Sequence, residues 1–202
     1  MSLRDTLPDA SALDRASKYE VLDVNGKKIA FGSIFADQKT VVVFIRHFFC
    51  GACKMYVETL LQVPEAVLQD AATKIVIVGC GEYQAIQAYH EMTNFKGSIY
   101  ADPSRQLYFT LGMDIQNLKV TPANQPKPSY YRMSRLSNLW WSIKTGHMQY
   151  PSLIGKTGNN SQLGGEFVFG PGDQCTFAHR MQHTEDHIEA VNLMKAAGVT
   201  WE

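Results

Sequence analysis

The chain has 202 residues, of which 45% are hydrophobic and 19% charged, a composition typical of one globular domain with a full hydrophobic core. Its 19 basic and 19 acidic residues give zero formal net charge without a basic patch, which argues against nucleic acid or an anionic membrane as the main partner. The first twenty residues lack the apolar core of a signal peptide, and no apolar run approaches the ~20 residues that span a membrane. Four cysteines are too sparse for a disulfide scaffold, so we expect a reducing, cytoplasmic location.

The first half of the chain predicts strands that alternate with helices. Residues 1–18 are interpreted as an N-terminal leader that frays or lies on the surface, and residues 19–202 as a single domain. Asn25-Gly26 is a favoured pair for a tight hairpin turn. The predicted elements are a hairpin over 19–35, a buried strand over 40–45, a helix over 51–63, a strand over 74–80 and a helix over 83–93.

The second half predicts a less regular arrangement. A short strand and a short helix are expected within 98–113, followed by an irregular insertion over about 114–163 with one helix over 130–146. A hairpin over 165–180 turns at Gly170-Pro171-Gly172, and a helix over 185–198 closes the chain. Together, these elements predict an α/β fold with a central mixed sheet flanked by helices on both faces.

Cys50 and Cys53 form a CxxC motif where the strand 40–45 is expected to pass into the helix 51–63. That placement is typical of a thioredoxin-like redox motif. Residues three apart in the first helical turn lie on the same side, so the two sulfurs can approach bonding distance. The partial positive charge of a helix N-terminus favours a thiolate at Cys50. We therefore expect Cys50 to be the more exposed, more acidic nucleophile, and Cys53 to be the resolving thiol.

Two other interpretations of this pair stay open from the residues alone. A zinc site needs about four ligands, but Cys80 and Cys175 are single cysteines. His179, His183 and His187 are spaced by four, yet His179 is expected on a strand, so a shared helical face is not predicted. Cysteines can also be inert, buried hydrophobes, which is the role expected for Cys80 and Cys175. The strand–helix junction favours redox chemistry with no metal and no cofactor.

Arg46 and His47 stand just before the motif, where positive charge would lower the pKa of the Cys50 thiol. The structural alternative is that one side chain points into the core and the other to solvent, because successive strand residues face opposite sides. Both are retained as candidate catalytic residues.

An aromatic group in the insertion has two interpretations. Tyr130, Tyr131, Trp140 and Trp141 fall within the predicted helix 130–146 and are expected to pack as one helix face on the sheet. Alternatively, Trp140 and Trp141 form an aromatic wall beside the cysteine pair and line an apolar substrate pocket.

Four segments occur in an order that resembles a known family: RHFFCGACKMYVETL, IYADPSRQLYFTLGM, GGEFVFGPG and HR…EDH. Over residues 19–199 the chain resembles the peroxiredoxin-like 2 group, the AhpC/TSA antioxidant-enzyme-domain proteins. The resemblance implies a thioredoxin-like fold with an N-terminal hairpin and a redox-active pair at Cys50 and Cys53. It also implies a thioredoxin- or glutathione-type reductant and a disulfide or peroxide substrate. Further recurrent positions of the group fall on Arg46, His47, Asp102, Pro103, Gly164, Gly165, His179, Arg180, Asp186 and His187.

The chain also departs from related enzymes. His47 stands three residues before Cys50, where peroxiredoxins carry a threonine that hydrogen-bonds peroxide. Gly164 and Gly165 stand where peroxiredoxins use an arginine and thioredoxins a cis-proline. We interpret the two glycines as open backbone that binds an extended substrate.

These features favour a thiol-disulfide oxidoreductase. Cys50 attacks a disulfide or an oxidised small substrate, Cys53 resolves, and an external thiol system resets the pair. A thiol-dependent peroxidase that passes through a sulfenic acid is the alternative within redox chemistry. Two other functions stay open: a redox-sensing or non-catalytic interaction protein, and a specialised biosynthetic enzyme that acts through the insertion. A homodimer also stays open.

Overall fold

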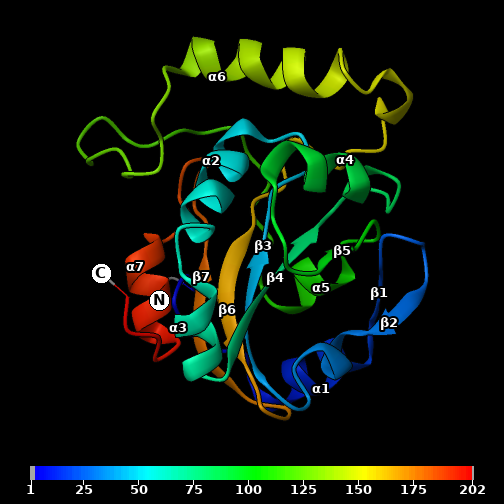
Figure 1. Ribbon diagram of the computed structural model, residues 1–202, viewed down its shortest axis with the longest axis vertical. Helices are drawn as coiled ribbons and strands as arrows, with labels where there is room; N and C mark the ends of the chain where they lie inside the picture. Colours follow the sequence, from blue (N-terminus) through cyan, green and yellow to red (C-terminus); the bar gives the residue numbers. More distant parts are fainter. Residues whose placement is uncertain (1–2, 202) are drawn as a thin grey trace.

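One mixed seven-stranded sheet forms the centre of the computed structural model, which describes residues 3–201 apart from the side chains of Arg135, Leu139 and His147 (Figure 1). The strands are β1 (Glu20–Leu22), β2 (Lys28–Ala30), β3 (Lys39–Phe44), β4 (Thr73–Gly79), β5 (Ile99–Ala101), β6 (Gly165–Phe169) and β7 (Cys175–Arg180), in the order β2-β1-β5-β4-β3-β6-β7. β3, β4 and β5 run parallel, and the other pairings are antiparallel.

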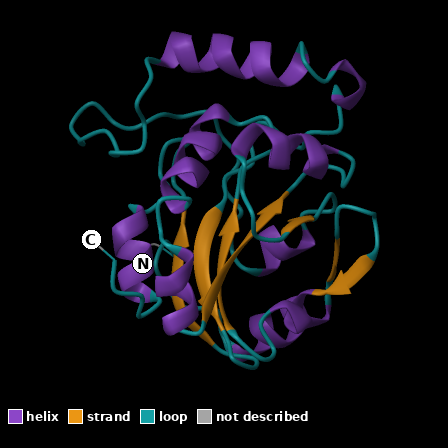
Figure 2. Cartoon of the chain, in the orientation of Figure 1, coloured by secondary structure: helices purple, strands orange, loops and turns teal. Residues whose placement is uncertain are grey.

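The helices lie on both faces of this sheet and across one end of it (Figure 2). They are α1 (Ala10–Lys18), α2 (Gly51–Leu60), α3 (Glu65–Asp70), α4 (Ala85–Thr93), α5 (Gln106–Thr110), α6 (Arg135–Ser142) and α7 (Ala190–Ala196). Shorter turns are the 3-10 helices η1 (Phe31–Ile34) and η3 (Pro151–Leu153), and the π-helix η2 (Ile143–His147). Among residues 3–201, no helix is long and apolar enough to cross a bilayer.

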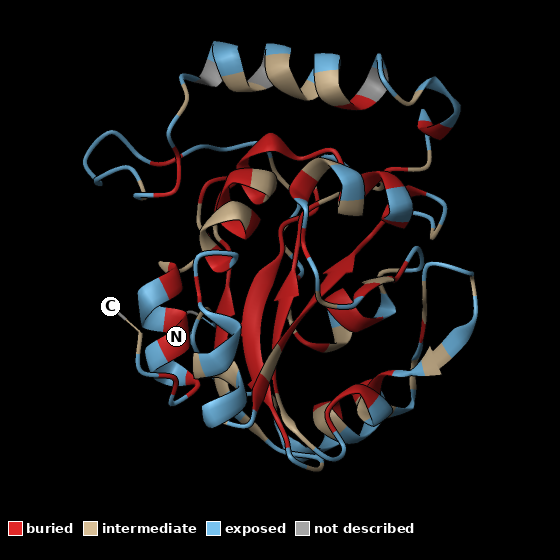
Figure 3. Ribbon diagram, in the orientation of Figure 1, coloured by how far each residue is buried: buried red, intermediate tan, exposed pale blue. Residues whose placement is uncertain are grey.

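The central strand β3 is largely buried (Figure 3), and its successive residues pack in two different cores. Val41 and Val43 pack in the cluster that includes α2, α4 and α7, whereas Val42 and Phe44 pack in the cluster that includes α1, η1 and α5. This follows from the period of two along a strand. The predicted α/β architecture is confirmed.

The N-terminal segment is more ordered than the sequence predicted. Part of the expected leader forms α1, where Asp9 Oδ1 accepts a 2.7 Å hydrogen bond from Ala12 N at the helix start. Upstream, Arg4 O accepts a 2.8 Å bond from Arg180 N at the end of β7. The segment before the predicted domain is therefore attached to the sheet by backbone bonds.

The closing helix begins later than predicted, at Ala190 rather than residue 185. Asp186 lies before that helix, where it accepts a 2.8 Å bond from Gln182 N and pairs with Arg4 at 2.8 Å. These contacts hold the preceding segment as a loop.

The insertion starts and ends where the sequence placed it. Leu163 N donates to Ile115 O at 3.1 Å, so the two ends of the segment 114–163 lie side by side. The helix within it was predicted over 130–146, but α6 begins at Arg135 and continues through η2 to His147. α6 packs against α2, and Figure 1 shows it lying across the end of the sheet, outside α2 and α4.

Candidate active site

The CxxC motif stands at the exit of β3, and Cys50 is the N-cap residue of α2. Its backbone is extended (φ −73°, ψ 111°), and its Sγ accepts a 3.2 Å hydrogen bond from Cys53 N. The sulfur thus satisfies a backbone N–H that a helix start would otherwise leave unpaired. The helix N-terminus therefore stabilises negative charge on Cys50.

The two sulfurs are 2.6 Å apart, with the Cys53 thiol directed at Cys50 Sγ. A disulfide between them needs only a small side-chain movement. Cys50 is 4% exposed and Cys53 is 0% exposed. Cys50 is therefore the more exposed of the two thiols, as the sequence predicted, although both are buried.

Arg46 contacts both sulfurs from the end of β3. Its Nη1 lies 3.4 Å from Cys50 Sγ, and its backbone N donates to Cys53 Sγ at 3.4 Å. Its Nη2 donates to Asn160 O at 2.5 Å, which fixes the guanidinium in place. Arg46 thus points inward to the pair.

The environments of the two thiols separate their acidities. Burial opposes ionisation of Cys50, but the thiol of Cys53 and the charges of Arg46 and His47 hold the pKa of Cys50 well below its ordinary value. Burial and the neighbouring Cys50 hold the pKa of Cys53 well above its ordinary value. The two pKa shifts therefore have the directions expected of a thiolate nucleophile at Cys50 and a protonated resolving thiol at Cys53.

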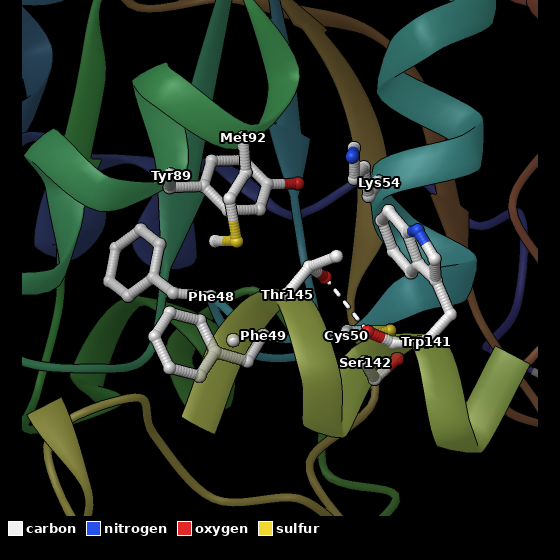
Figure 4. Close-up of a pocket in the computed structure, with 10 residues that line it drawn as sticks. Phe48, Phe49, Cys50, Lys54, Tyr89, Met92, Trp141, Ser142 and Thr145 are labelled. Carbon is white, nitrogen blue, oxygen red and sulfur yellow. Dashed lines mark hydrogen bonds between the residues drawn. The ribbon is translucent and has the colours of Figure 1, made fainter. Parts of the chain in front are cut away.

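A narrow cavity of about 10 Å³, room for about one water molecule, lies beside Cys50 (Figure 4). Trp141 and Ser142 line it from α6, and Lys54 from α2. Lys54 Nζ is 3.9 Å from the centre of the Trp141 ring, a cation–π contact that fixes the indole. The rest of the lining is largely apolar: Phe48, Phe49, Tyr89 and Met92.

Of the four aromatic residues predicted to form a helix face, Trp141 lines the cavity and the other three lie elsewhere. Trp140 is 64% exposed. Tyr130 and Tyr131 precede α6 and are buried, with Tyr130 against Tyr56 at 5.2 Å between ring centres. The expected single aromatic face is therefore wrong, because the helix starts after the tyrosines.

Gly164 and Gly165 do not offer open backbone. Gly165 pairs with Phe44 of β3 on one side and with Arg180 of β7 on the other. Gly164 O accepts from Met181 N at 3.0 Å, and a Cβ on Gly164 would lie 1.8 Å from Phe44 O. The glycines let strands approach closely, which corrects their expected role in binding substrate.

Cys80, Cys175 and His179 have no part in this chemistry. Cys80 is buried, its thiol donates to Arg46 O at 2.9 Å, and burial raises its pKa to about 11. Burial likewise raises the pKa of Cys175 to about 11. His179 contacts Asp5 at 2.9 Å. Among the side chains that the structure describes, no group of three metal-ligating residues could hold a metal ion.

Sequence reasoning missed a buried histidine–glutamate hydrogen bond beneath α2. His187 Nδ1 pairs with Glu166 Oε1, and both side chains are 0% exposed. The ring of Tyr56, one turn after Cys53 on α2, stacks on His187 with ring centres 4.3 Å apart. A glutamate inside the apolar run GEFVF was the available signal, because a fully buried glutamate requires a partner.

Comparison with known proteins identifies the family. The family model described as AhpC/TSA antioxidant enzyme matches residues 60–183, which lie after the CxxC motif. Peroxiredoxin-like 2C of Mus musculus is 32% identical over 183 residues, covering 91% of this chain and 79% of its own length. Prostamide/prostaglandin F synthase of Aquarana catesbeiana is 25% identical over 180 residues, covering 88% of this chain and 83% of its own.

The solved structures agree on the fold. A cysteine-to-serine mutant of peroxiredoxin 6 of Arenicola marina matches with a TM-score of 0.59 at 14% identity, covering 96% of this chain and 72% of that one. The fold is therefore thioredoxin-like, as the sequence predicted. The chain belongs to the AhpC/TSA antioxidant enzyme family, in its peroxiredoxin-like 2 group.

Proposed function

We propose that the protein is a thiol oxidoreductase that uses Cys50 as nucleophile and Cys53 as resolving thiol to reduce a disulfide or another small oxidised substrate. The observation that carries the proposal is the arrangement of Arg46 at 3.4 Å from Cys50 Sγ, with the Cys53 thiol directed at the same sulfur. This arrangement favours a thiolate at Cys50 and a thiol at Cys53. Membership of a thiol redox family supports the same chemistry.

The reaction with a disulfide balances as two exchanges. The Cys50 thiolate attacks one substrate sulfur, the substrate S–S bond breaks, and the leaving thiolate takes up a proton. Cys53 then loses its proton and attacks Cys50 Sγ, which releases the second substrate thiol and leaves a Cys50–Cys53 disulfide. A thioredoxin- or glutathione-type thiol returns two electrons and restores the pair.

The covered position of Cys50 favours small substrates. With 4% exposure beneath α6, the thiol is less accessible to a folded protein disulfide than to a small molecule. A synthase of small molecules among the relatives supports this preference.

Peroxide is the second candidate substrate. The family's antioxidant description and the guanidinium beside Cys50 favour it, because a cation can stabilise the developing negative charge on the leaving oxygen. The threonine of peroxiredoxins is replaced by His47, so disulfide reduction remains the preferred activity. A cytoplasmic location, which would supply the reductant, stays a prediction from the sparse cysteines.

Steady-state assays with a small disulfide and with an organic hydroperoxide, each recycled by thioredoxin or glutathione, test the proposal. Cys50→Ser should abolish turnover, and Cys53→Ser should accumulate a mixed disulfide on Cys50. Cys80→Ser is the matched control and should retain the rate. Full activity in Cys50→Ser would contradict the proposal.

A further inference from the structure

The helix formed by α6 and the start of η2 presents large apolar side chains to solvent. Leu136, Trp140 and Ile143 are spaced four and three residues apart, so they share one side of the helix and form an apolar stripe. Their exposures are 82%, 64% and 38%. A surface helix of a globular protein ordinarily turns its apolar side to the core. The arrangement in α6 is the reverse of this.

The opposite side of α6 is held against α2 through polar residues. A Cβ built on Gly51 would lie 2.0 Å from Asn138 Oδ1 and 2.5 Å from Ser142 Oγ, so glycine is what lets the two helices approach this closely. Asn138 and Ser142 are four residues apart and share the side that meets α2. Because this contact fixes how α6 is rotated, and α6 is the outermost element at this end of the molecule, the apolar stripe faces solvent (Figure 1).

Exposed apolar residues are concentrated in the insertion that contains α6. Among the described residues, thirteen large hydrophobic residues are exposed, and seven of them lie within residues 115–165, about a quarter of the chain. Five of the seven fall in one short stretch: Leu136, Trp140, Ile143, Met148 and Ile154. Single exposed apolar residues are ordinary on a protein surface, whereas a group of them marks an interaction site.

The same segment carries only positive formal charge. Residues 115–165 contain six lysines and arginines and no aspartate or glutamate, whereas the rest of the chain contains thirteen basic and nineteen acidic residues. The zero net charge of the whole chain, which argued against an anionic membrane, therefore results from two parts of opposite charge. Lys144, directly after Ile143, and Arg132, just before α6, are exposed, and neither has an ion pair among the described residues. Positive charge thus borders the apolar stripe.

We propose that the apolar stripe of α6 docks the protein on a lipid bilayer that contains anionic phospholipids, independently of the redox function proposed above. The helix lies in the plane of the surface, with the stripe among the head groups and upper acyl chains and Lys144 beside the anionic phosphates. Trp140 suits this depth, because an indole is apolar but carries one N–H donor. Since the inner side of α6 lies on Gly51, docking holds the cysteine pair about one helix diameter from the lipid.

The combination of charge and apolar surface favours a bilayer over the other possible occupants. In a two-fold symmetric dimer the same surface meets itself, so the basic insertion of one copy would lie against the basic insertion of the other. Nucleic acid would match the charge but not the apolar stripe. Anionic lipid provides counter-charges for Lys144 and Arg132 and an apolar phase for the stripe in one surface.

Cosedimentation with vesicles tests the proposal. Wild-type protein should bind vesicles that contain about one-third phosphatidylserine in phosphatidylcholine, and should bind pure phosphatidylcholine about tenfold or more weakly. Trp140→Ser should weaken binding to the mixed vesicles by about tenfold, because the largest apolar side chain of the stripe is lost. Lys144→Gln should weaken it by about fivefold. Both side chains are exposed, so both variants should fold.

Two exposed residues of α7 provide matched controls outside the insertion. Val191→Ser removes an exposed apolar side chain and Lys195→Gln an exposed positive charge, and each should change vesicle binding less than twofold. If wild-type protein bound no mixed vesicles, or if the control variants lost as much binding as Trp140→Ser and Lys144→Gln, the proposal would be wrong.

Tryptophan fluorescence locates the contact on α6. The emission of the three tryptophans of the chain should shift to shorter wavelength on the mixed vesicles. Trp140→Phe keeps an apolar ring, so it should stay bound but lose most of that shift. A bound Trp140→Phe variant with the full shift would place the contact elsewhere. Sedimentation equilibrium without lipid tests the second copy: a dimer that Trp140→Ser dissociates, in a protein that binds no vesicles, would replace the bilayer as the occupant.

Discussion

Arg46 Nη1 lies 3.4 Å from Cys50 Sγ, and both residues are more than nine-tenths buried. A guanidinium away from water requires an anion or strong acceptors nearby, and a thiolate away from water requires a cation or donors. Each group therefore stabilises the charged form of the other. This pairing accounts for an acidic cysteine within a largely apolar core.

Replacing Arg46 tests that pairing. Arg46→Ala should raise the pKa of Cys50 toward its ordinary value and slow its alkylation at neutral pH by about tenfold or more, because the nearest cation is lost. Arg46→Lys keeps the positive charge, so its alkylation rate should fall less than that of Arg46→Ala. Iodoacetamide rates measured across pH report both effects, and an unchanged pH profile in Arg46→Ala would exclude Arg46 as the stabilising charge.

Stability should depend on pH through the same thiol. Because folding lowers the pKa of Cys50, the thiolate stabilises the folded state at pH values above the unfolded thiol pKa of about 8.5. That contribution should decline as pH falls toward the folded pKa and vanish below it. Urea unfolding of the reduced protein should therefore show the stability gap between wild type and Cys50→Ser narrowing as pH decreases. If the stability difference between wild type and Cys50→Ser instead grew as the pH fell, folding would raise the pKa of Cys50 rather than lower it.

Gly51→Ala should displace α6 without harming α2. Gly51 is the first residue of α2, where alanine is compatible with the helix, so local helix propensity predicts no loss. Contact with Asn138 and Ser142 instead predicts that α6 shifts away. Cys50 should then alkylate faster with iodoacetamide, because α6 covers it less. An unchanged alkylation rate would show that α6 does not restrict access to Cys50.

Strong local patterns explain which parts of the fold could be predicted. The apolar run of β3 and the helical spacing after Cys50 correctly predicted that the CxxC motif lies between a strand and a helix. Both elements are largely buried, so their hydrophobic patterns are clear in the sequence. The predicted start of the closing helix was wrong where long-range contacts, rather than local helix propensity, determine the backbone. Asp186 could cap a helix, but its contacts with Arg4 and Gln182 hold a loop instead.

The sequence predicted only those site residues that are neighbours in the chain. Cys50, Cys53 and Arg46 are neighbours in sequence, so their meeting follows from one strand–helix junction. Asn138 lies far later in the chain, and nothing in its local pattern indicates that α6 crosses Gly51. Such contacts depend on how the insertion returns over the sheet.

The Glu166–His187 pair should contribute strongly to stability. Glu166→Leu leaves a buried imidazole without its hydrogen-bond partner and should destabilise the protein by roughly 1–3 kcal/mol. Adding His187→Phe, which preserves stacking on Tyr56, should recover much of that loss. Urea unfolding of the two single variants and the double variant measures the coupling. Strictly additive losses would mean that the two side chains do not depend on each other.

The central claim, that Cys50 and Cys53 form a redox couple, is tested most directly by its reduction potential. Protein equilibrated against graded ratios of oxidised and reduced dithiothreitol or glutathione, then trapped with a thiol reagent and analysed by mass spectrometry, should show one reversible two-electron transition confined to these cysteines. The potential should fall within about −270 to −120 mV, the range of exchanging CxxC proteins. A pair that forms no disulfide across that range, or forms one that thiols do not reduce, would contradict the account.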